Sequence, residues 1–242
     1  MTAGNAVISG ERIFCQNAGS SGSMYIVELL KTNGIGPSYH ELMPDLDEEG
    51  IAYYEGAVPD DQMKAVLRQT RQRVYFEANN RLFAMSKLLK EVFPEARFIH
   101  LHRDPRDLMA SALSKPPELT YGSGRRRYES VKLNGPKQLP LLQKMCRYWA
   151  NYNRRILDDL EGMDTLSLSF TDLISGNIDA LEDFLETRLP IRKIPPVNAE
   201  KPVRKEGRYP AFENWPEEDQ QTLLQICGPV MSNLGYEWDR EK

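Results

Sequence analysis

Arg103 and Ser111 are the two residues whose types and spacing are best suited to bind an anion. Arg103 follows residues 97–102, which are predicted to form a buried strand, and a helix is predicted to open at Asp104. Asp104 can cap this helix and Pro105 suits its first position. Ser111 then lies about two turns along the helix. A guanidinium at the carboxyl end of a strand, with a hydroxyl nearby, suits a phosphate group. The alternative is an ordinary capped helix that carries a surface arginine.

A second candidate anion site is the loop Gly19-Ser20-Ser21-Gly22-Ser23, between a predicted strand and a predicted helix. Glycine lets backbone N–H groups approach a ligand, serine hydroxyls donate, and a helix amino terminus carries partial positive charge. The loop is not a Walker A motif, because Ser23 and Met24 stand where Lys and Ser/Thr would be needed. Many strand-to-helix loops are rich in glycine and serine, so an ordinary loop is the alternative.

Two side chains could act as a general base. Glu77 stands at the carboxyl end of a predicted strand, residues 74–77, and His40 follows Pro37-Ser-Tyr. The alternatives are a solvated carboxylate at a strand end and an exposed loop histidine. His100 and His102 alternate along one strand, but no third or fourth ligand is evident, so we expect packed histidines and no metal site.

The segment Arg103-Asp-Pro-Arg-Asp107, followed by Ser111, strongly resembles the 3′-phosphate-binding segment of sulfotransferases that use 3′-phosphoadenosine 5′-phosphosulfate (PAPS). Ser21-Gly22-Ser23 is similar to the 5′-phosphosulfate loop of that family. The resemblance implies that the chain binds PAPS and passes its sulfuryl group to a hydroxyl or amine of a small-molecule or carbohydrate acceptor. The product would be adenosine 3′,5′-bisphosphate.

The same resemblance implies roles for three further residues. Glu77, in Phe76-Glu-Ala-Asn-Asn80, stands where carbohydrate sulfotransferases and many bacterial relatives carry a catalytic glutamate. The tail Val203-Arg-Lys-Glu-Gly-Arg208 resembles a loop that closes over the 3′-phosphate, which implies that Arg204 and Lys205 contact that group.

Ser20 departs from the family pattern, because the family usually carries Arg or Lys at that place. This cation helps to neutralise the bridging oxygen as the sulfuryl group leaves, and loss of one such donor can cost ~10²–10³ in rate. The candidates to replace it are Arg81, Arg106, Lys205 and the run Arg125-Arg-Arg127.

The order of predicted elements indicates how these groups are positioned. Strands alternate with helices, which predicts a three-layer α/β/α fold with a mostly parallel central sheet, and the resemblance implies a P-loop-like sulfotransferase fold. We expect a single domain over residues 1–242. Residues 35–60 carry Gly, Pro and acidic side chains and are predicted to be irregular; residues 114–138 are predicted to be a basic loop, either a lid or disordered. The predicted helices include 82–92, 139–160, 178–187 and 217–234, and the predicted strands include 12–16 and 165–170.

Composition excludes several classes of protein. A net charge of −4, with both signs interspersed, argues against broad nucleic-acid binding. Three widely spaced cysteines form no zinc pattern or disulfide framework. No signal peptide is evident, and no apolar run approaches the ~18–20 residues of a membrane span. We therefore expect a cytoplasmic enzyme that is a monomer or homodimer.

Two rival functions stay open. Ser20 motivates a non-catalytic protein that binds PAPS or adenosine 3′,5′-bisphosphate without turnover. An ATP-dependent kinase is disfavoured because the Walker lysine is missing.

Overall fold

The structure is a computed structural model that describes residues 12–42, 46–69, 75–115, 130–197 and 207–237. The chain forms two compact units. The first unit combines Met1–His102 with Arg155–Val197, and the second combines Arg103–Arg154 with Asn198–Lys242.

A five-stranded parallel sheet forms the centre of the first unit. Its strand order is β2-β3-β1-β4-β5, and every neighbouring pair is parallel. Since parallel neighbours cannot be joined by a tight hairpin, the chain crosses over through helices between successive strands. The strands are β1 (Arg12–Gln16), β2 (Ser38–His40), β3 (Phe76–Ala78), β4 (Ala96–His102) and β5 (Thr165–Ser169).

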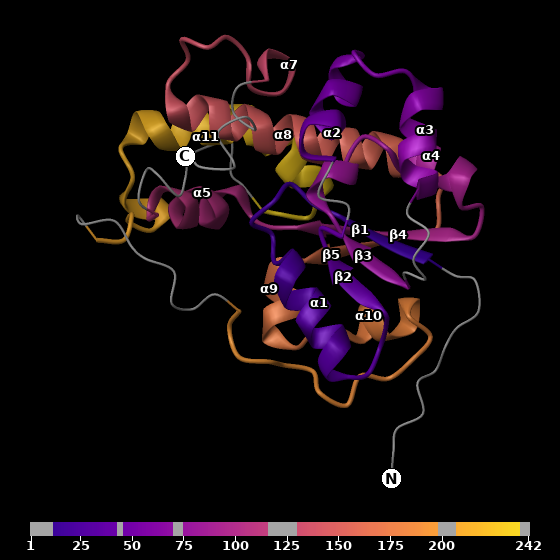
Figure 1. Cartoon of the computed structure of the whole chain (residues 1–242). Coiled ribbons are helices and arrows are strands. Elements are labelled where there is room, and N and C mark those ends of the chain that lie inside the picture. Colours follow the sequence, from indigo (N-terminus) through magenta and orange to yellow (C-terminus); the bar gives the residue numbers. More distant parts are fainter. Residues whose placement is uncertain (1–11, 43–45, 70–74, 116–129, 198–206, 238–242) are drawn as a thin grey trace. The chain divides into compact units, whose positions relative to one another are not determined.

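Helices lie on both faces of this sheet (Figure 1). One face carries α1 (Ser23–Thr32), α9 (Phe170–Ser175) and α10 (Asp179–Phe184). On the other side lie α2 (Leu46–Glu55), α3 (Asp60–Gln69) and α4 (Ser86–Val92). The short 3₁₀ helix η1 (Asn80–Leu82) lies between β3 and α4 in the chain. The predicted three-layer arrangement around a parallel sheet is therefore confirmed.

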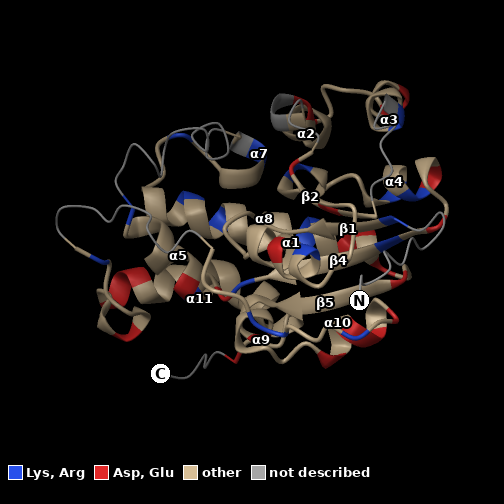
Figure 2. Cartoon of the chain, turned by 60° about the horizontal axis from the view of Figure 1, so that its bottom comes forward, with Lys and Arg blue, Asp and Glu red and all other residues tan. Residues whose placement is uncertain are grey.

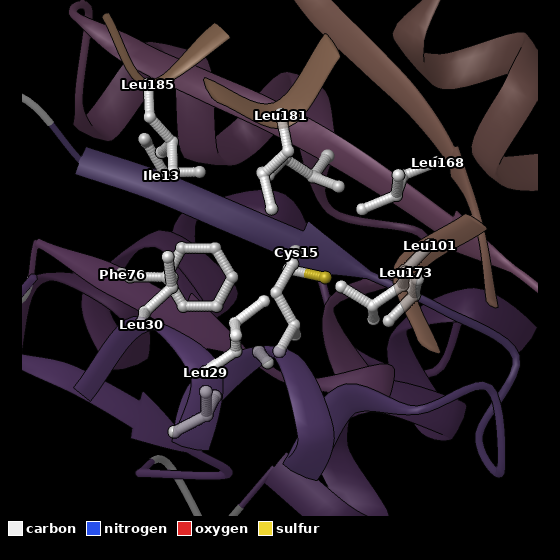
Figure 3. Packing of buried hydrophobic residues seen from close by; sticks show 14 of the residues in the cluster. Ile13, Cys15, Leu29, Leu30, Phe76, Leu101, Leu168, Leu173, Leu181 and Leu185 are labelled. Atoms are coloured by element: carbon white, nitrogen blue, oxygen red, sulfur yellow. The ribbon is translucent and has the colours of Figure 1, made fainter. Parts of the chain in front are cut away.

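A hydrophobic core of the first unit lies between the sheet and α1, α9 and α10. Alternate strand residues such as Ile13 and Cys15 point into it, together with Phe76 and with Leu29 and Leu30 of α1 (Figure 3). The residues between them in the strands face the opposite layer, because side chains alternate along a strand.

The second unit is helical. Its elements are α5 (Pro105–Leu113), α7 (Val131–Asn134), the first part of α8 (Leu141–Leu160), η3 (Phe212–Asn214) and α11 (Glu217–Asn233). Trp149 of α8 is fully buried, and the Cys227 thiol of α11 donates a hydrogen bond to the Cys146 carbonyl of α8. All three cysteines of the chain are buried and carry free thiols.

The prediction that residues 35–60 are irregular is wrong, because this segment contains β2 and α2. The three residues of β2 are too few to show a periodic pattern. Gly50 signalled a loop, yet it lies inside α2 at a close packing contact, where a Cβ would lie 2.9 Å from the carbonyl oxygen of Arg81.

Two other predictions need correction in detail. Residues 82–92 do not form one helix, since η1 ends at Leu82 and α4 begins at Ser86. The basic loop predicted for 114–138 contains the short helix α7, and its residues 116–129 lie outside the described part of the chain. The lid therefore stays a prediction.

Charges of both signs are found on the elements of each unit (Figure 2). None of the described helices combines the length and the apolar character that crossing a membrane requires.

Candidate functional site

The loop between β1 and α1 is shaped by its own side chains. Asn17 accepts a hydrogen bond from the Gly19 amide through Oδ1 at 2.8 Å, and the Ser21 hydroxyl donates to the Gly19 carbonyl at 3.2 Å. Gly19, Ser20 and Gly22 have positive φ angles of 71°, 55° and 96°. The backbone therefore makes a tight left-handed turn before it enters the helix.

The amino terminus of α1 has the properties of an anion site. Gly22 is the N-cap residue and makes no side-chain cap, and the first turn contains no acidic residue. The first N–H groups of a helix have no intrahelical partners and lie at the positive end of its dipole. The sequence signal was a Gly/Ser loop, and the structure places that loop directly before a ten-residue helix.

Ser23, the first residue of α1, is hydrogen-bonded to His40. The distance between Ser23 Oγ and His40 Nε2 is 2.9 Å. His40 ends β2 and is paired with Ala78 of β3. Ala78 belongs to the core beneath α1, so the register places His40 on the α1 face of the sheet.

Glu77 lies on β3, near the carboxyl ends of the parallel strands, and its carboxylate is fully buried. Its Oε1 accepts hydrogen bonds from the Leu42 amide at 2.9 Å and from Asn79 Nδ2 at 3.2 Å. Glu77 is in register with Phe14 of β1, which alternates with Ile13 and therefore faces away from α1. The strand register thus assigns Glu77 and His40 to opposite faces of the sheet.

Two of the candidate replacement cations have carboxylate partners. Arg81 Nη1 lies 2.9 Å from Glu41 Oε1, and the Arg106 guanidinium pairs with Asp104. Lys205 and the 125–127 run lie outside the described residues.

Arg103 lies in the second unit, where it precedes α5. Asp104 caps α5 as predicted, since its side chain accepts from the Arg106 amide at 2.8 Å. Trp149 Nε1 donates to the Arg103 carbonyl at 3.0 Å, which fixes the backbone at this turn. Ser111 lies on α5 and is half-buried.

The Arg103 side chain is partly buried and stays charged. Burial lowers the pKa of Arg103, and electrostatic interactions with Asp107, Tyr236 and Asp104 oppose this shift. A guanidinium remains protonated under such conditions because its ordinary pKa lies far above neutral pH. A partly desolvated, permanent cation beside the amino terminus of α5 suits an anionic ligand.

The predicted residues therefore divide between the units. The first unit contains the loop Gly19–Ser23, His40 and Glu77, and the second contains Arg103 and Ser111. Arg204 and Lys205 lie outside the described residues. The predictions missed Asn17, Asn79 and Trp149, which orient these groups. Asn17 had a recognisable signal, because Asn two positions before Gly is typical of a side-chain-closed turn.

His100 and His102 are both buried, with their ring centroids 5.5 Å apart. Burial, reinforced by His100, lowers the pKa of His102 to about 3, and Asp172 acts in the opposite direction. His102 is therefore neutral near pH 7. No group of three or more possible His, Cys, Asp or Glu ligands gathers anywhere in the described part of the chain.

The second unit also has a cavity of about 1010 Å³ beside η3 and α11. Arg106 and Phe212 line it together with Glu213, Glu217 and Glu237. Because Arg106 is paired with Asp104, the net charge of this wall is unfavourable for a nucleotide phosphate.

Comparisons with known proteins identify the family and the fold. The sequence model described as "Sulfotransferase family" matches residues 22–187. A solved sulfotransferase domain from the curacin biosynthetic pathway superposes with a TM-score of 0.52 at 16% identity, covering 95% of this chain and 99% of that one. A sulfotransferase from Alicyclobacillus acidocaldarius gives a TM-score of 0.49 at 12% identity, covering 94% and 97%. No curated protein matches the sequence closely enough to count as a relative. At these identities the structural likeness concerns the fold.

Proposed function

The chain belongs to the sulfotransferase family, and on that premise we propose that it transfers the sulfuryl group of PAPS to a small-molecule or carbohydrate acceptor. The acceptor's hydroxyl oxygen or amine nitrogen attacks sulfur, and the bond between sulfur and the bridging oxygen breaks. The electron pair of that bond stays on the 5′-phosphate of the product, adenosine 3′,5′-bisphosphate. The acceptor loses one proton in the process.

The observation that carries this proposal is the amino terminus of α1. It is preceded by a left-handed loop, has no side-chain cap and has no acidic residue in its first turn. Backbone amides of the loop and the Ser23 hydroxyl would hold the 5′-phosphosulfate there, while the Ser21 hydroxyl, which donates to the Gly19 carbonyl, fixes the shape of the loop. The backbone amides are fixed by the fold, so they stabilise charge that develops in the transition state without reorganising.

Glu77 is the proposed general base. Its Oε1 accepts hydrogen bonds from Leu42 and Asn79, which orient the carboxylate. Glu77 lies near the carboxyl ends of the strands, where ligands bind in open α/β folds. A base of this kind accelerates transfer by roughly 10²–10⁴. His40 is the second candidate for this role.

Arg103 and Ser111 would hold the 3′-phosphate, with Arg204 and Lys205 added from the tail. The Trp149 hydrogen bond to the Arg103 carbonyl and the Asp104 cap support this assignment, because both fix the turn that carries the guanidinium. No metal ion is required for the transfer.

A non-catalytic nucleotide-binding protein is the second candidate function. Ser20 favours it, since the loop side chains from Gly19 to Ser23 carry no charge and the candidate cations Arg81 and Arg106 are paired with carboxylates.

Two measurements test these functions. A sulfotransferase-like site binds adenosine 3′,5′-bisphosphate more tightly than AMP or ATP in calorimetric titration; equal affinities would contradict the proposal. Labelled PAPS offered with a panel of alcohols, amines and sugars then separates enzyme from binder. Transfer to any acceptor supports the enzyme, whereas tight product binding without transfer or PAPS hydrolysis supports the binder.

A further inference from the structure

The loop Gly19–Ser23, called the donor loop because it would bind the sulfuryl donor, needs a source of positive charge that its own side chains do not provide. When the sulfuryl group leaves, negative charge develops on the bridging oxygen, and a cation aimed at that atom stabilises the transition state. The loop Gly19–Ser23 consists of glycine and serine alone. His40 is an ionisable side chain in direct hydrogen-bonded contact with it, through Ser23.

We propose that His40 acts in its protonated form as the charge of the donor loop and as the group that orients the Ser23 hydroxyl toward the donor's phosphate. This inference rests on the proposed function, because it concerns the same loop and the same ligand. It gives His40 a role opposite to that of a general base.

The hydrogen-bond inventory of the two side chains leads to this role. A neutral imidazole with its proton on Nδ1 accepts at Nε2. The Ser23 hydroxyl then donates its single proton to His40 and has none left for a ligand. A protonated imidazole donates at both nitrogens. Ser23 then accepts from Nε2–H, and its own proton is available for a phosphate oxygen. At a separation of 2.9 Å the contact serves either direction, and protonation makes Nε2 the donor whichever nitrogen carries the proton in the neutral ring.

The charges around His40 make this protonation dependent on a ligand. The positive end of the α1 dipole lies beside Ser23 and disfavours a nearby cation until an anion binds. On β3 the carboxylate of Glu77 falls on the opposite face of the sheet. Next to His40, Glu41 is paired with Arg81.

The charged groups that the structure describes on α1 and α9 are an ion pair and a hydrogen-bonded carboxylate. On α1, Glu28 and Lys31 pair with each other at 2.9 Å, and the nearer of the two lies about 7–8 Å along the helix from Ser23. On α9, which packs against the loop through Phe170, Asp172 accepts from Ser169 and Asn177. A bound phosphate brings negative charge to this loop and so favours the imidazolium, and by reciprocity protonation of His40 strengthens phosphate binding.

The decisive variant is His40→Gln. Its side-chain amide can donate a hydrogen bond from near the position of Nε2, but it neither titrates nor carries charge. The probe is adenosine 3′,5′-bisphosphate, titrated by calorimetry from pH 5.5 to 8.5. The probe's own phosphates lose their second proton near pH 6, and this effect is the same in both proteins, so the difference between them isolates His40.

For the wild-type protein we expect affinity to fall about 10-fold more between pH 6 and 8 than for His40→Gln, equivalent to about 1.4 kcal/mol. Parallel pH profiles, or a wild-type affinity that rises relative to the variant, would overturn the role of His40. Absence of binding by the wild-type protein at every pH would instead reject the proposed function itself.

A second measurement on the wild-type protein does not depend on how the variant folds. The binding heat of adenosine 3′,5′-bisphosphate is measured at pH 7.5 in buffers of different ionisation enthalpy. The same titration is repeated with adenosine 5′-phosphosulfate, a ligand whose phosphosulfate does not titrate in this range. Net proton uptake on binding supports the imidazolium. Proton release or no exchange contradicts it.

Discussion

Gly22 and Phe170 approach each other so closely that the loop tolerates no side chain at position 22. A Cβ built on Gly22 would lie 2.3 Å from Phe170 Cδ2, and Gly22 has a φ of +96°. Phe170 begins α9 directly after β5. The aromatic ring of a distant segment therefore packs against the backbone that opens α1, and it helps to define the shape of the donor loop.

Gly22→Ala should consequently disturb this loop. Alanine at positive φ is strained and its methyl group would displace Phe170, which together we expect to cost about 2–4 kcal/mol of stability. Gly34→Ala is the matched control, since Gly34 also has a positive φ, +72°, but has open space around it. Thermal unfolding and adenosine 3′,5′-bisphosphate titration of both variants measure the effect. Equal losses would show that the contact with Phe170 has no energetic consequence.

Ser20→Lys tests whether the donor loop lacks a charge. Ser20 is exposed and has a φ of +55°, a conformation that lysine adopts with no more strain than serine. If the missing cation limits the reaction, the variant raises sulfuryl transfer or PAPS hydrolysis about 10-fold or more. If protonated His40 already provides the charge, the added lysine repels it and activity stays level or falls.

Ser20→Gln is the control for this variant, because it adds a similar chain without charge. A gain shared by Ser20→Lys and Ser20→Gln would mean that size, not charge, matters at position 20. Hydrolysis of labelled PAPS without an acceptor provides the measurement.

How much of this site the sequence could predict depends on the range of the interactions involved. The Asp104 cap and the strand before it are local, since they depend on neighbouring residues, and both were predictable. The strand register follows from pairing between segments far apart in the chain. For this reason the sequence indicated Glu77 and His40 as alternatives for one role, while the register assigns them to opposite faces.

The Ser23–His40 contact could not be predicted for the same reason. It joins residues 17 positions apart, and it requires β2, a strand of three residues that has no sequence signature. Gly22 was predictable as a loop residue, but the reason that it must be glycine is the Phe170 ring, which the chain supplies about 150 residues later.

Arg103→Ala should weaken adenosine 3′,5′-bisphosphate binding and leave AMP binding almost unchanged. A charge-assisted contact to a phosphate is worth roughly 1.5–3 kcal/mol, so the expected loss is about 10- to 150-fold. Ser111→Ala should act in the same direction but more mildly. Equal losses for the two nucleotides in calorimetric titration would reject the assignment of Arg103 to the 3′-phosphate.

His102 predicts how stability changes with pH. Its pKa in the folded protein is about 3, against an ordinary value of 6.5, so folding favours the neutral form. The corresponding stability is complete above about pH 6.5 and is lost as the pH falls toward 3, by up to about 1.4 kcal/mol per pH unit. His102→Gln should lose less stability than wild type between pH 7.5 and 5. Urea unfolding at both pH values tests this, and equal losses in the two proteins would contradict it.

Glu77→Gln should reduce turnover far more than affinity for the donor. The glutamine oxygen can still accept from Leu42 and Asn79, as Glu77 Oε1 does, so the local fold is preserved while the proton acceptor is lost. We expect turnover to fall by roughly 10²–10⁴.

Glu182→Gln is the matched control, because Glu182 is also a buried carboxylate of the first unit, but its partners are the Leu189 amide and Arg188. That variant should lose stability and keep turnover per folded molecule. If Glu77→Gln retains wild-type turnover with a saturating acceptor, Glu77 has a structural role and the general base lies elsewhere.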